Sequence, residues 1–161
     1  MAEGKHWMVG TVMAVVDRGR VLLVRHTYGE RKSLWALPWG SASHDERLDQ
    51  TAMREVREET GLETEVVDLI GLRTRIGEKG GALFPLFRLR LVAGELKPDG
   101  VEVDQAAFFS AEEVTAMGDD QIFPMARNVV LAALAEAHGL PEDEHFPARS
   151  DTYRAFLLGV E

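Results

Sequence analysis

Residues 40–62 read GSASHDERLDQTAMREVREETGL, and this stretch decides the fold more than any other. Within it, apolar residues recur at every fourth position, at Leu48, Ala52 and Val56. That spacing is typical of one face of an α-helix. Gly61 then stands where helices commonly end on a left-handed glycine. The pattern predicts a helix over residues 48–60 that packs one side against a core.

Three glutamates, Glu55, Glu58 and Glu59, project from one side of this helix, because they stand at positions i, i+3 and i+4. Glu59 falls inside the apolar stripe, where a carboxylate loses hydration. Glu58 and Glu59 also lie in the last turn, where the helix dipole disfavours negative charge. Carboxylate oxygens are the ligands of hard cations such as Mg²⁺ and Mn²⁺, and the cluster favours such a site. The alternative is a solvated acidic face with a surface pair between Arg54 and Glu58.

The stretch resembles the Nudix box, G-x5-E-x7-R-E-U-x-E-E-x-G-U, in which U is aliphatic. Every specified position is matched, at Gly40, Glu46, Arg54, Glu55, Val56, Glu58, Glu59, Gly61 and Leu62. The resemblance implies an α/β fold, the Nudix-type α/β/α sandwich with a central mixed sheet. It also implies a metal-dependent hydrolase that uses Mg²⁺ or Mn²⁺. Such an enzyme cleaves a diphosphate bond in a nucleoside diphosphate linked to another moiety, such as ADP-ribose, or in a nucleoside triphosphate.

The resemblance further implies roles for single residues. The metal ligands would be Glu55, Glu58, Glu59 and the backbone carbonyl of Trp39. Arg54 would brace the loop by pairing with Glu46, which is otherwise an additional metal ligand. The implied catalytic residues are therefore Glu58, Glu59 and Arg54, with Gly40 at the substrate. A second interpretation of Glu46 is an S-x-x-E capping box with Ser43.

Two positions depart from the family's usual pattern. Trp39 stands where a glycine is common, so its φ must be negative, because a bulky residue at positive φ is costly. Its ring would either stack on a base or cover the loop. Asp45 stands before Glu46 where a glycine is frequent, and it would either add a metal-facing acid or alter the turn.

Basic and acidic residues outside the box are further candidates. Arg73, Arg75 and Lys79 lie on or beside a glycine-rich connection and would clamp a phosphate, or else belong to a solvated hairpin. Arg25 precedes a polar loop and is a second candidate for substrate binding, with a solvated loop as the alternative. The general base would be Glu59 or one of two later acids, Glu102 and Asp104. The two later acids are otherwise ordinary turn residues.

The rest of the chain reads as strands with two more helices. Apolar runs rich in β-branched residues predict strands over residues 7–16, 21–26, 63–76, 83–92 and 101–109. Pro85 indicates an edge strand or a bulge. Ser110 is the expected N-cap of a short helix, and a longer helix is expected over residues 124–137, ending at Gly139. We expect a single domain over residues 1–161, with residues 140–161 as a candidate C-terminal arm.

Composition narrows the function. The chain has 18 basic and 27 acidic residues, a net charge of −9, so binding to a nucleic-acid backbone is disfavoured. It has no cysteine and no long apolar run, which predicts a cytoplasmic protein without a membrane partner. The expected partner is a small nucleotide-type substrate, with a homodimer through residues 153–160 as a further candidate. A nucleotide sensor without catalysis is the rival function, whereas an isoprenoid diphosphate isomerase would need the missing cysteine.

Overall fold

The computed structural model describes residues 6–78, 80–135, 138–142, 144, 151–152 and 156. Its strands are β1 (His6–Asp17), β2 (Arg20–His26), β3 (Trp35–Ala36), β4 (Trp39–Ser41), β5 (Leu62–Gly77), β6 (Gly80–Gly94), β7 (Val103–Phe109) and β8 (Leu140–Pro141). Its helices are α1 (Leu48–Thr60), α2 (Ala111–Ala116), α3 (Pro124–Leu134) and a short 3₁₀ turn, η1 (Gly29–Arg31).

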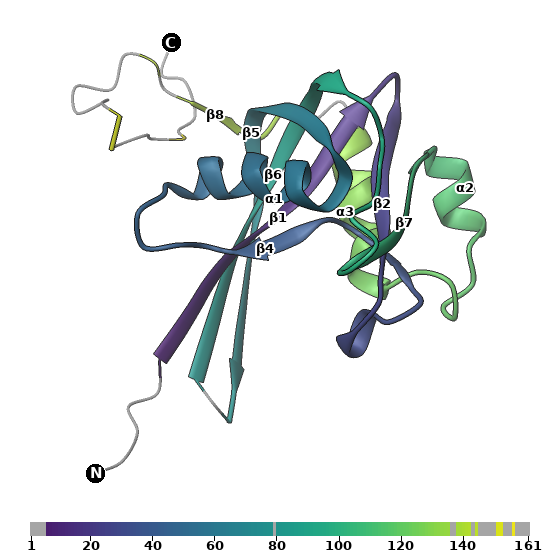
Figure 1. Ribbon diagram of the computed structural model, residues 1–161, viewed down its shortest axis with the longest axis horizontal. Helices are drawn as coiled ribbons and strands as arrows, with labels where there is room; N and C mark the ends of the chain where they lie inside the picture. Colours follow the sequence, from purple (N-terminus) through teal and green to yellow (C-terminus); the bar gives the residue numbers. More distant parts are fainter. Residues whose placement is uncertain are drawn as a thin grey trace.

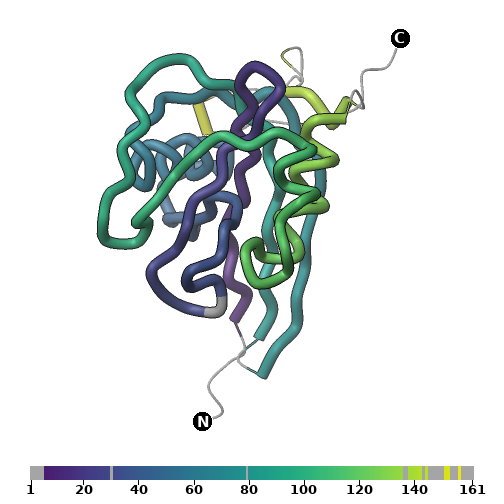
Figure 2. Tube along the Cα trace, turned by 90° about the vertical axis from the view of Figure 1, so that its right-hand side faces the viewer, coloured from purple at the N-terminus to yellow at the C-terminus, as the bar shows by residue number. Residues whose placement is uncertain are grey.

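A mixed sheet forms the middle layer, in the order β3-β2-β1-β6-β5-β8, with β4 paired to β1 and β7 paired to β2. Helix α1 covers one face of the sheet, and α2 and α3 lie on the other (Figure 1, Figure 2). The expected α/β/α sandwich is confirmed. No helix in the described part of the chain is long and apolar enough to cross a lipid bilayer.

Strand β1 supplies side chains to both halves of the core. Val12 and Ala14 belong to the cluster beneath α3, whereas Met13 and Val15 belong to the cluster beneath α1. All four are almost completely buried. Successive residues of a strand point to opposite faces, so one continuous apolar run serves two helical layers.

Strand β6 lies in the centre of the sheet, between β1 and β5, so the edge-strand interpretation of Pro85 is wrong. The parallel pairing of β1 with β6 pauses between the pairs Val9–Leu83 and Val12–Leu86. Val12 pairs with Trp39 of β4 as well as with Leu86 of β6, so β4 lies along the opposite edge of β1, where Thr11 pairs with Gly40. Proline lacks an N–H, so it fits where the ladder is interrupted. The pairing of β1 with β4 brings Gly40, the first residue of the box, into the sheet.

Helix α1 has the predicted bounds. Gly61 ends it with a φ of 74°, and its N–H donates to the Arg57 carbonyl at 2.8 Å. At the other end, the Gln50 side chain accepts the Arg47 N–H at 2.9 Å. Ser43 is therefore not the N-cap of this helix, which begins at Leu48. One of the two hydrogen bonds of the predicted capping box is nevertheless present, because the Glu46 side chain accepts the Ser43 N–H at 2.9 Å.

Helix α3 is shorter than predicted, since it ends at Leu134 and Ala135 is already extended. Gly139 serves another purpose: its N–H donates to Asp68 Oδ2 at 2.8 Å, and a Cβ there would lie 2.6 Å from the Leu69 carbonyl oxygen. The glycine therefore allows a close approach to β5, which β8 then joins. The short helix α2 is as expected, because the Ser110 hydroxyl accepts the Glu113 N–H at 3.3 Å.

Much of the candidate C-terminal arm, and Lys79 of the basic connection, lie outside the described residues. Within the described part of the arm, Phe156 packs against Phe87 of β6, with ring centroids 5.3 Å apart. Glu142 and Phe156 form an isolated antiparallel bridge.

Candidate active site

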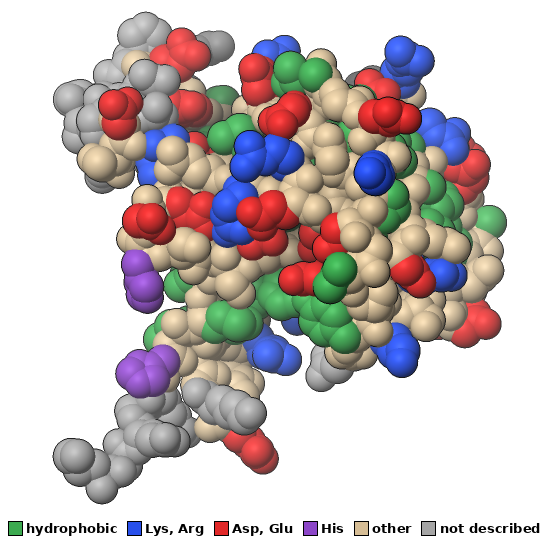
Figure 3. Space-filling model, viewed as in Figure 1, with side chains coloured by type: hydrophobic (Ala, Val, Ile, Leu, Met, Phe, Trp, Pro, Cys, Tyr) green, Lys and Arg blue, Asp and Glu red, His purple; other side chains and the backbone are tan. Residues whose placement is uncertain are grey.

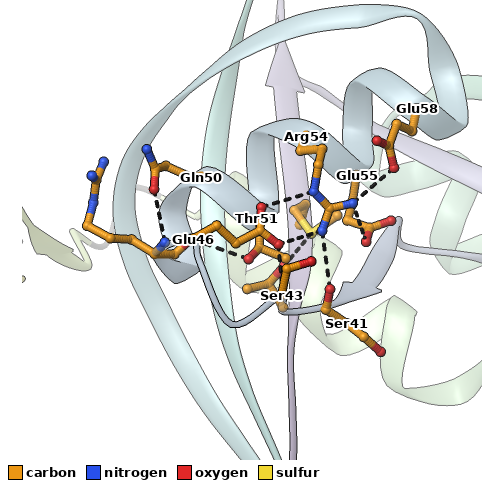
Figure 4. Close-up of polar contacts among 11 residues, drawn as sticks. Ser41, Ser43, Glu46, Gln50, Thr51, Arg54, Glu55 and Glu58 are labelled. Carbon is orange, nitrogen blue, oxygen red and sulfur yellow. Dashed lines mark hydrogen bonds and ion pairs between the residues drawn. The ribbon is translucent and has the colours of Figure 1, made fainter. Parts of the chain in front are cut away.

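The guanidinium of Arg54 is the centre of the site (Figure 4). It donates to both oxygens of Glu46, at 3.0 and 2.6 Å, and to one oxygen each of Glu55 and Glu58, both at 2.9 Å. It also reaches the Ser41 carbonyl at 3.2 Å. One side chain of α1 therefore ties the end of β4, the loop and the helix together.

Glu46 is fully engaged by these contacts. Besides Arg54, it accepts the Ser43 N–H at 2.9 Å. The hydrogen bond from Arg54 is the main reason that the pKa of Glu46 falls to about 2. Because both of its oxygens already have donors, the geometry suits a brace for the loop better than an additional metal ligand.

In contrast to Glu46, Glu59 and Glu55 have pKa values that are raised by burial. Glu59 is 3% exposed, and its Oε2 has no hydrogen-bond partner among the described residues. Burial raises the pKa of Glu59 well above its usual value, and the charges of Glu55, Glu102 and Asp99 add to this effect. Burial also raises the pKa of Glu55. Four carboxylates from two segments, α1 and the loop before β7, are thus close enough to influence one another.

Gly40 is needed here for space. A Cβ at this position would lie 1.9 Å from Cδ of Glu55 and 2.3 Å from its Oε1. The carboxylate of Glu55 therefore packs directly on the backbone of β4. Trp39 meets the condition set by the sequence, since the non-glycine residues with positive φ in the described chain are Arg18 and Ser33.

The acidic residues fit a divalent cation chemically. Glu59 offers a buried oxygen without a partner, next to Glu55 and to the backbone of Trp39, which hydrogen-bonds to Glu59. Oxygen donors of this kind bind Mg²⁺ and Mn²⁺. No three Asp, Glu or His side chains in the described part of the chain already converge as a complete metal site. Glu55 and Glu58 each bond instead to Arg54, and Glu58 remains 55% exposed.

Glu102 and Asp104, the two candidate acids that follow the box in the sequence, have different partners. Glu102 accepts a hydrogen bond from the Tyr28 hydroxyl at 2.9 Å, and its charge acts on Glu59. Asp104 instead forms a bidentate pair with Arg25, at 2.8 and 2.9 Å. Of the two distant candidates for a general base, Glu102 is the one whose charge acts on the box glutamates. Arg25, expected at the substrate, bonds to Asp104.

Sequence reasoning did not single out Asp99, which organises the loop that carries Glu102. One of its oxygens accepts the N–H groups of Val101 and Val103, both at 2.9 Å. The only signal for this role is the Asp-Gly turn pair at residues 99–100, which is typical of an Asx turn.

A cavity of about 210 Å³ is lined in part by residues that touch the acidic cluster. Tyr28 and Trp39 line it, together with Arg73 and Arg75 from the basic hairpin. Both arginines are among the substrate-binding residues predicted from the sequence. The apolar Met8, Phe84 and Phe123 also line the cavity and were missed, because apolar residues in strands and helices ordinarily indicate core.

His26 forms part of the same wall and is buried. Neither ring nitrogen has a hydrogen-bond partner among the described residues. Burial, with a smaller effect from the charge of Arg31, lowers the pKa of His26 to about 4. The imidazole is therefore neutral at physiological pH.

The face of the molecule over α1 shows acidic and basic side chains side by side (Figure 3).

A family model described as the NUDIX domain matches residues 5–129 of the chain. The chain belongs to the Nudix family. The matched residues contain the whole Nudix box and the described lining of the cavity.

Curated proteins of similar sequence support the assignment to the Nudix family. An ADP-ribose pyrophosphatase of Methanocaldococcus jannaschii is 29% identical over 103 residues, which cover 63% of this chain and 60% of the relative. Nudix hydrolase 6 of Arabidopsis thaliana is 30% identical over 136 residues, covering 80% of this chain and 48% of the relative. The chain thus spans less than two thirds of each of these Nudix relatives.

Solved structures support the fold. A MutT Nudix hydrolase from Burkholderia pseudomallei superposes with a TM-score of 0.68 at 20% identity, covering 79% of this chain and 98% of that one. A Nudix hydrolase from Nitrosomonas europaea gives a TM-score of 0.66 at 24% identity, covering 78% and 68%. At these identities the likeness speaks for the Nudix fold alone.

Proposed function

We propose that this Nudix protein is a pyrophosphohydrolase that requires Mg²⁺ or Mn²⁺. Its substrate is a nucleoside diphosphate linked to another moiety. The observation that carries the proposal is the buried Oε2 of Glu59, which has no hydrogen-bond partner among the described residues. It lies beside Glu55, in a box whose loop is held by Arg54. Bound there, the cation supplies charge neutralisation for the diphosphate and lowers the pKa of a water molecule.

Side chains of this chain hold the cation, accept the proton and contact the substrate. Glu55, Glu58 and Glu59 hold the cation, and Arg54 fixes two of these carboxylates while Glu46 anchors Arg54. Glu102 is the candidate for accepting a proton from the attacking water, since its charge acts on Glu59 from the opposite loop. Arg73 and Arg75 contact the substrate from the cavity.

The substrate class is supported by the relatives' names and by the charge of the site. One relative is named an ADP-ribose pyrophosphatase and another an NAD-capped RNA hydrolase, and ADP-ribose and NAD both contain a diphosphate bridge between two moieties. A protein of net charge −9 binds such a polyanion only with local positive charge, which cations and arginines provide. A cytoplasmic location and a homodimer remain predictions from the sequence.

The test is a panel of diphosphates assayed with Mg²⁺, with Mn²⁺ and with a chelator. The panel holds ADP-ribose, a nucleoside diphosphate sugar, a dinucleoside polyphosphate and a nucleoside triphosphate. We expect hydrolysis only with a cation present. Glu58→Gln should lower kcat by about 100-fold or more, because removing groups that merely support a metal ligand already costs 10–100-fold.

Glu63→Gln is the matched control, since Glu63 is an exposed acid of β5 outside the box. It should leave kcat unchanged, and both variants should keep the melting temperature of the parent. Cation-independent turnover, or no turnover of any panel member, would reject the proposed function.

A further inference from the structure

The cavity beside the acidic cluster is basic, although the chain as a whole is acidic. Arg31, Arg73 and Arg75 line it, and none of its described lining residues is Asp or Glu. Arg73 and Arg75 stand two residues apart on β5, opposite Phe84 and Ala82 of β6, so both side chains leave the same face of the hairpin.

Two of these arginines lie on the aromatic rings of the cavity. The guanidinium carbon of Arg31 is 4.7 Å from the ring centroid of Trp39 and 5.1 Å from that of Phe123. Arg73 lies over Phe84 at 5.5 Å. Because guanidinium groups cover these rings, an incoming base would have to displace them before it could stack there.

Stacking also prepares a guanidinium for an anion. A ring beneath the planar group fixes its orientation and leaves the N–H donors at its edge available for oxygen acceptors. Phosphate and carboxylate groups accept such donors in pairs. The ring of Phe84 therefore holds the guanidinium of Arg73 in place for an anionic ligand.

Arg73 and Arg75 also keep their charge uncompensated. Most arginines in the described part of the chain are neutralised by carboxylates; Arg25, for example, pairs with Asp104. Arg73 and Arg75 form no ion pair with any described residue. Cations inside a walled cavity concentrate anions from solution.

We propose that this cavity binds a second anionic group of the substrate, a phosphate ester on one of the two moieties that the scissile diphosphate joins, and not an uncharged base. The inference rests on the proposed function. Tyr28 and Trp39 line the cavity and also contact the acidic cluster, through Glu102 and Glu59 respectively. A substrate can thus place its diphosphate at the glutamates and its phosphate ester at the arginines.

The first experiment measures binding of inorganic phosphate by calorimetry in the presence of EDTA, so that it does not depend on hydrolysis. The variant is Arg73→Gln with Arg75→Gln. The control is Arg18→Gln with Arg90→Gln, which removes the same charge at exposed positions outside the cavity. Circular dichroism checks that both variants are folded.

We expect the parent and the control to bind phosphate with equal Kd, and the Arg73 and Arg75 variant to bind at least about tenfold more weakly, the effect of losing one charged hydrogen bond. Absence of saturable binding, or an equal Kd in all three proteins, would overturn the proposal. Neither result bears on hydrolysis, so the two proposals fail separately.

The second experiment compares substrates that differ by one phosphate ester: ADP-ribose with its 2′-phosphate, and 3′-dephospho-coenzyme A with coenzyme A. In the parent, kcat/KM should favour the phosphorylated member of at least one pair by about tenfold or more. The Arg73 and Arg75 variant should remove this preference. Equal kcat/KM for the two members of both pairs in the parent would refute the inference. An equal loss of kcat/KM for both members in the variant would show that the arginines serve the shared diphosphate, and would refute it as well.

Discussion

Replacing Gly40 by alanine tests the packing of the box directly. The new Cβ would lie 1.9 Å from Cδ of Glu55, whereas ordinary contacts are 3.4 Å or longer, so Glu55 must move by about 1.5 Å. That movement takes Glu55 away from its bond with Arg54 and from the neighbourhood of Glu59. Since a displacement of about 1 Å can cost 100-fold in rate, we expect kcat/KM to fall by about 100-fold or more.

The assay is cation-dependent hydrolysis of the best substrate from the panel. Gly71→Ala is the matched control, because its Cβ would meet Leu86 at 3.8 Å, an ordinary contact. Neither glycine has a positive φ, so the two substitutions differ in the space available and not in backbone strain. Gly71→Ala should keep kcat/KM within about twofold of the parent, in line with the small effects of unstrained substitutions.

A folded Gly40→Ala protein with kcat/KM close to that of the parent would refute this reasoning. It would mean that the position of Glu55 against β4 does not matter for turnover. Melting temperature and circular dichroism distinguish a displaced carboxylate from an unfolded chain, because only the former leaves both near the values of the parent.

Three further predictions concern stability, measured by urea unfolding in EDTA. Arg54→Gln should lower the free energy of unfolding at pH 7 by about 1–2 kcal/mol, a value already reduced for solvent screening. The reason is that the depressed pKa of Glu46 stabilises the fold above pH 4.5, and this stabilisation disappears as the pH falls towards 2. Between pH 6.5 and 4, His26 should lower the stability of the parent by up to about 3 kcal/mol relative to His26→Phe, because the unfolded imidazole takes up a proton over this range whereas the folded one does so only near pH 4. The raised pKa values of Glu55 and Glu59 act in the opposite direction, but in both proteins alike. Asp68→Ala should cost about 3–5 kcal/mol, because it removes the carboxylate that balances the charge of the largely buried Arg88.

Each of these predictions has its own control. The cost of Arg54→Gln must shrink at pH 3, and a constant cost would speak against Glu46 as the cause. An unchanged pH slope in His26→Phe would show that another group titrates there. Glu65→Ala breaks the exposed pair with Arg90 and should cost less than about 1 kcal/mol, so an equal cost for Asp68→Ala would contradict the effect of burial.

Local sequence signals predicted the parts of the fold that depend on local chemistry. The bounds of α1 follow from its apolar period and from Gly61, which ends the helix in a left-handed conformation. The burial of Glu59 follows from its place in the same stripe. Gly139 misled the prediction for α3, because a glycine after a helix can serve either as a cap or for close approach to another strand, and the sequence does not distinguish the two.

Non-local contacts were beyond sequence reasoning. The pairing of Arg25 with Asp104 depends on how β2 and β7 align, and β2 also carries an irregularity between Arg25 and His26. Arg31 contacts Phe123 as well as Trp39, although Phe123 lies far away in the chain, so no spacing rule reveals the cavity that they line. The Nudix box predicts the chemistry of the acidic cluster, but the basic lining of the cavity forms only once the strands are in register.

The parallel pairing of β1 with β6 also has a consequence for biosynthesis. His6 lies opposite Gly80 and Val16 opposite Arg90, so more than 70 further residues must be synthesised after β1 before its central neighbour exists. Long-range pairing of this kind slows folding and leaves strand edges open to wrong partners. A nascent chain halted before residue 80 therefore carries a complete Nudix box on an unfinished sheet, and we expect it to depend on chaperones.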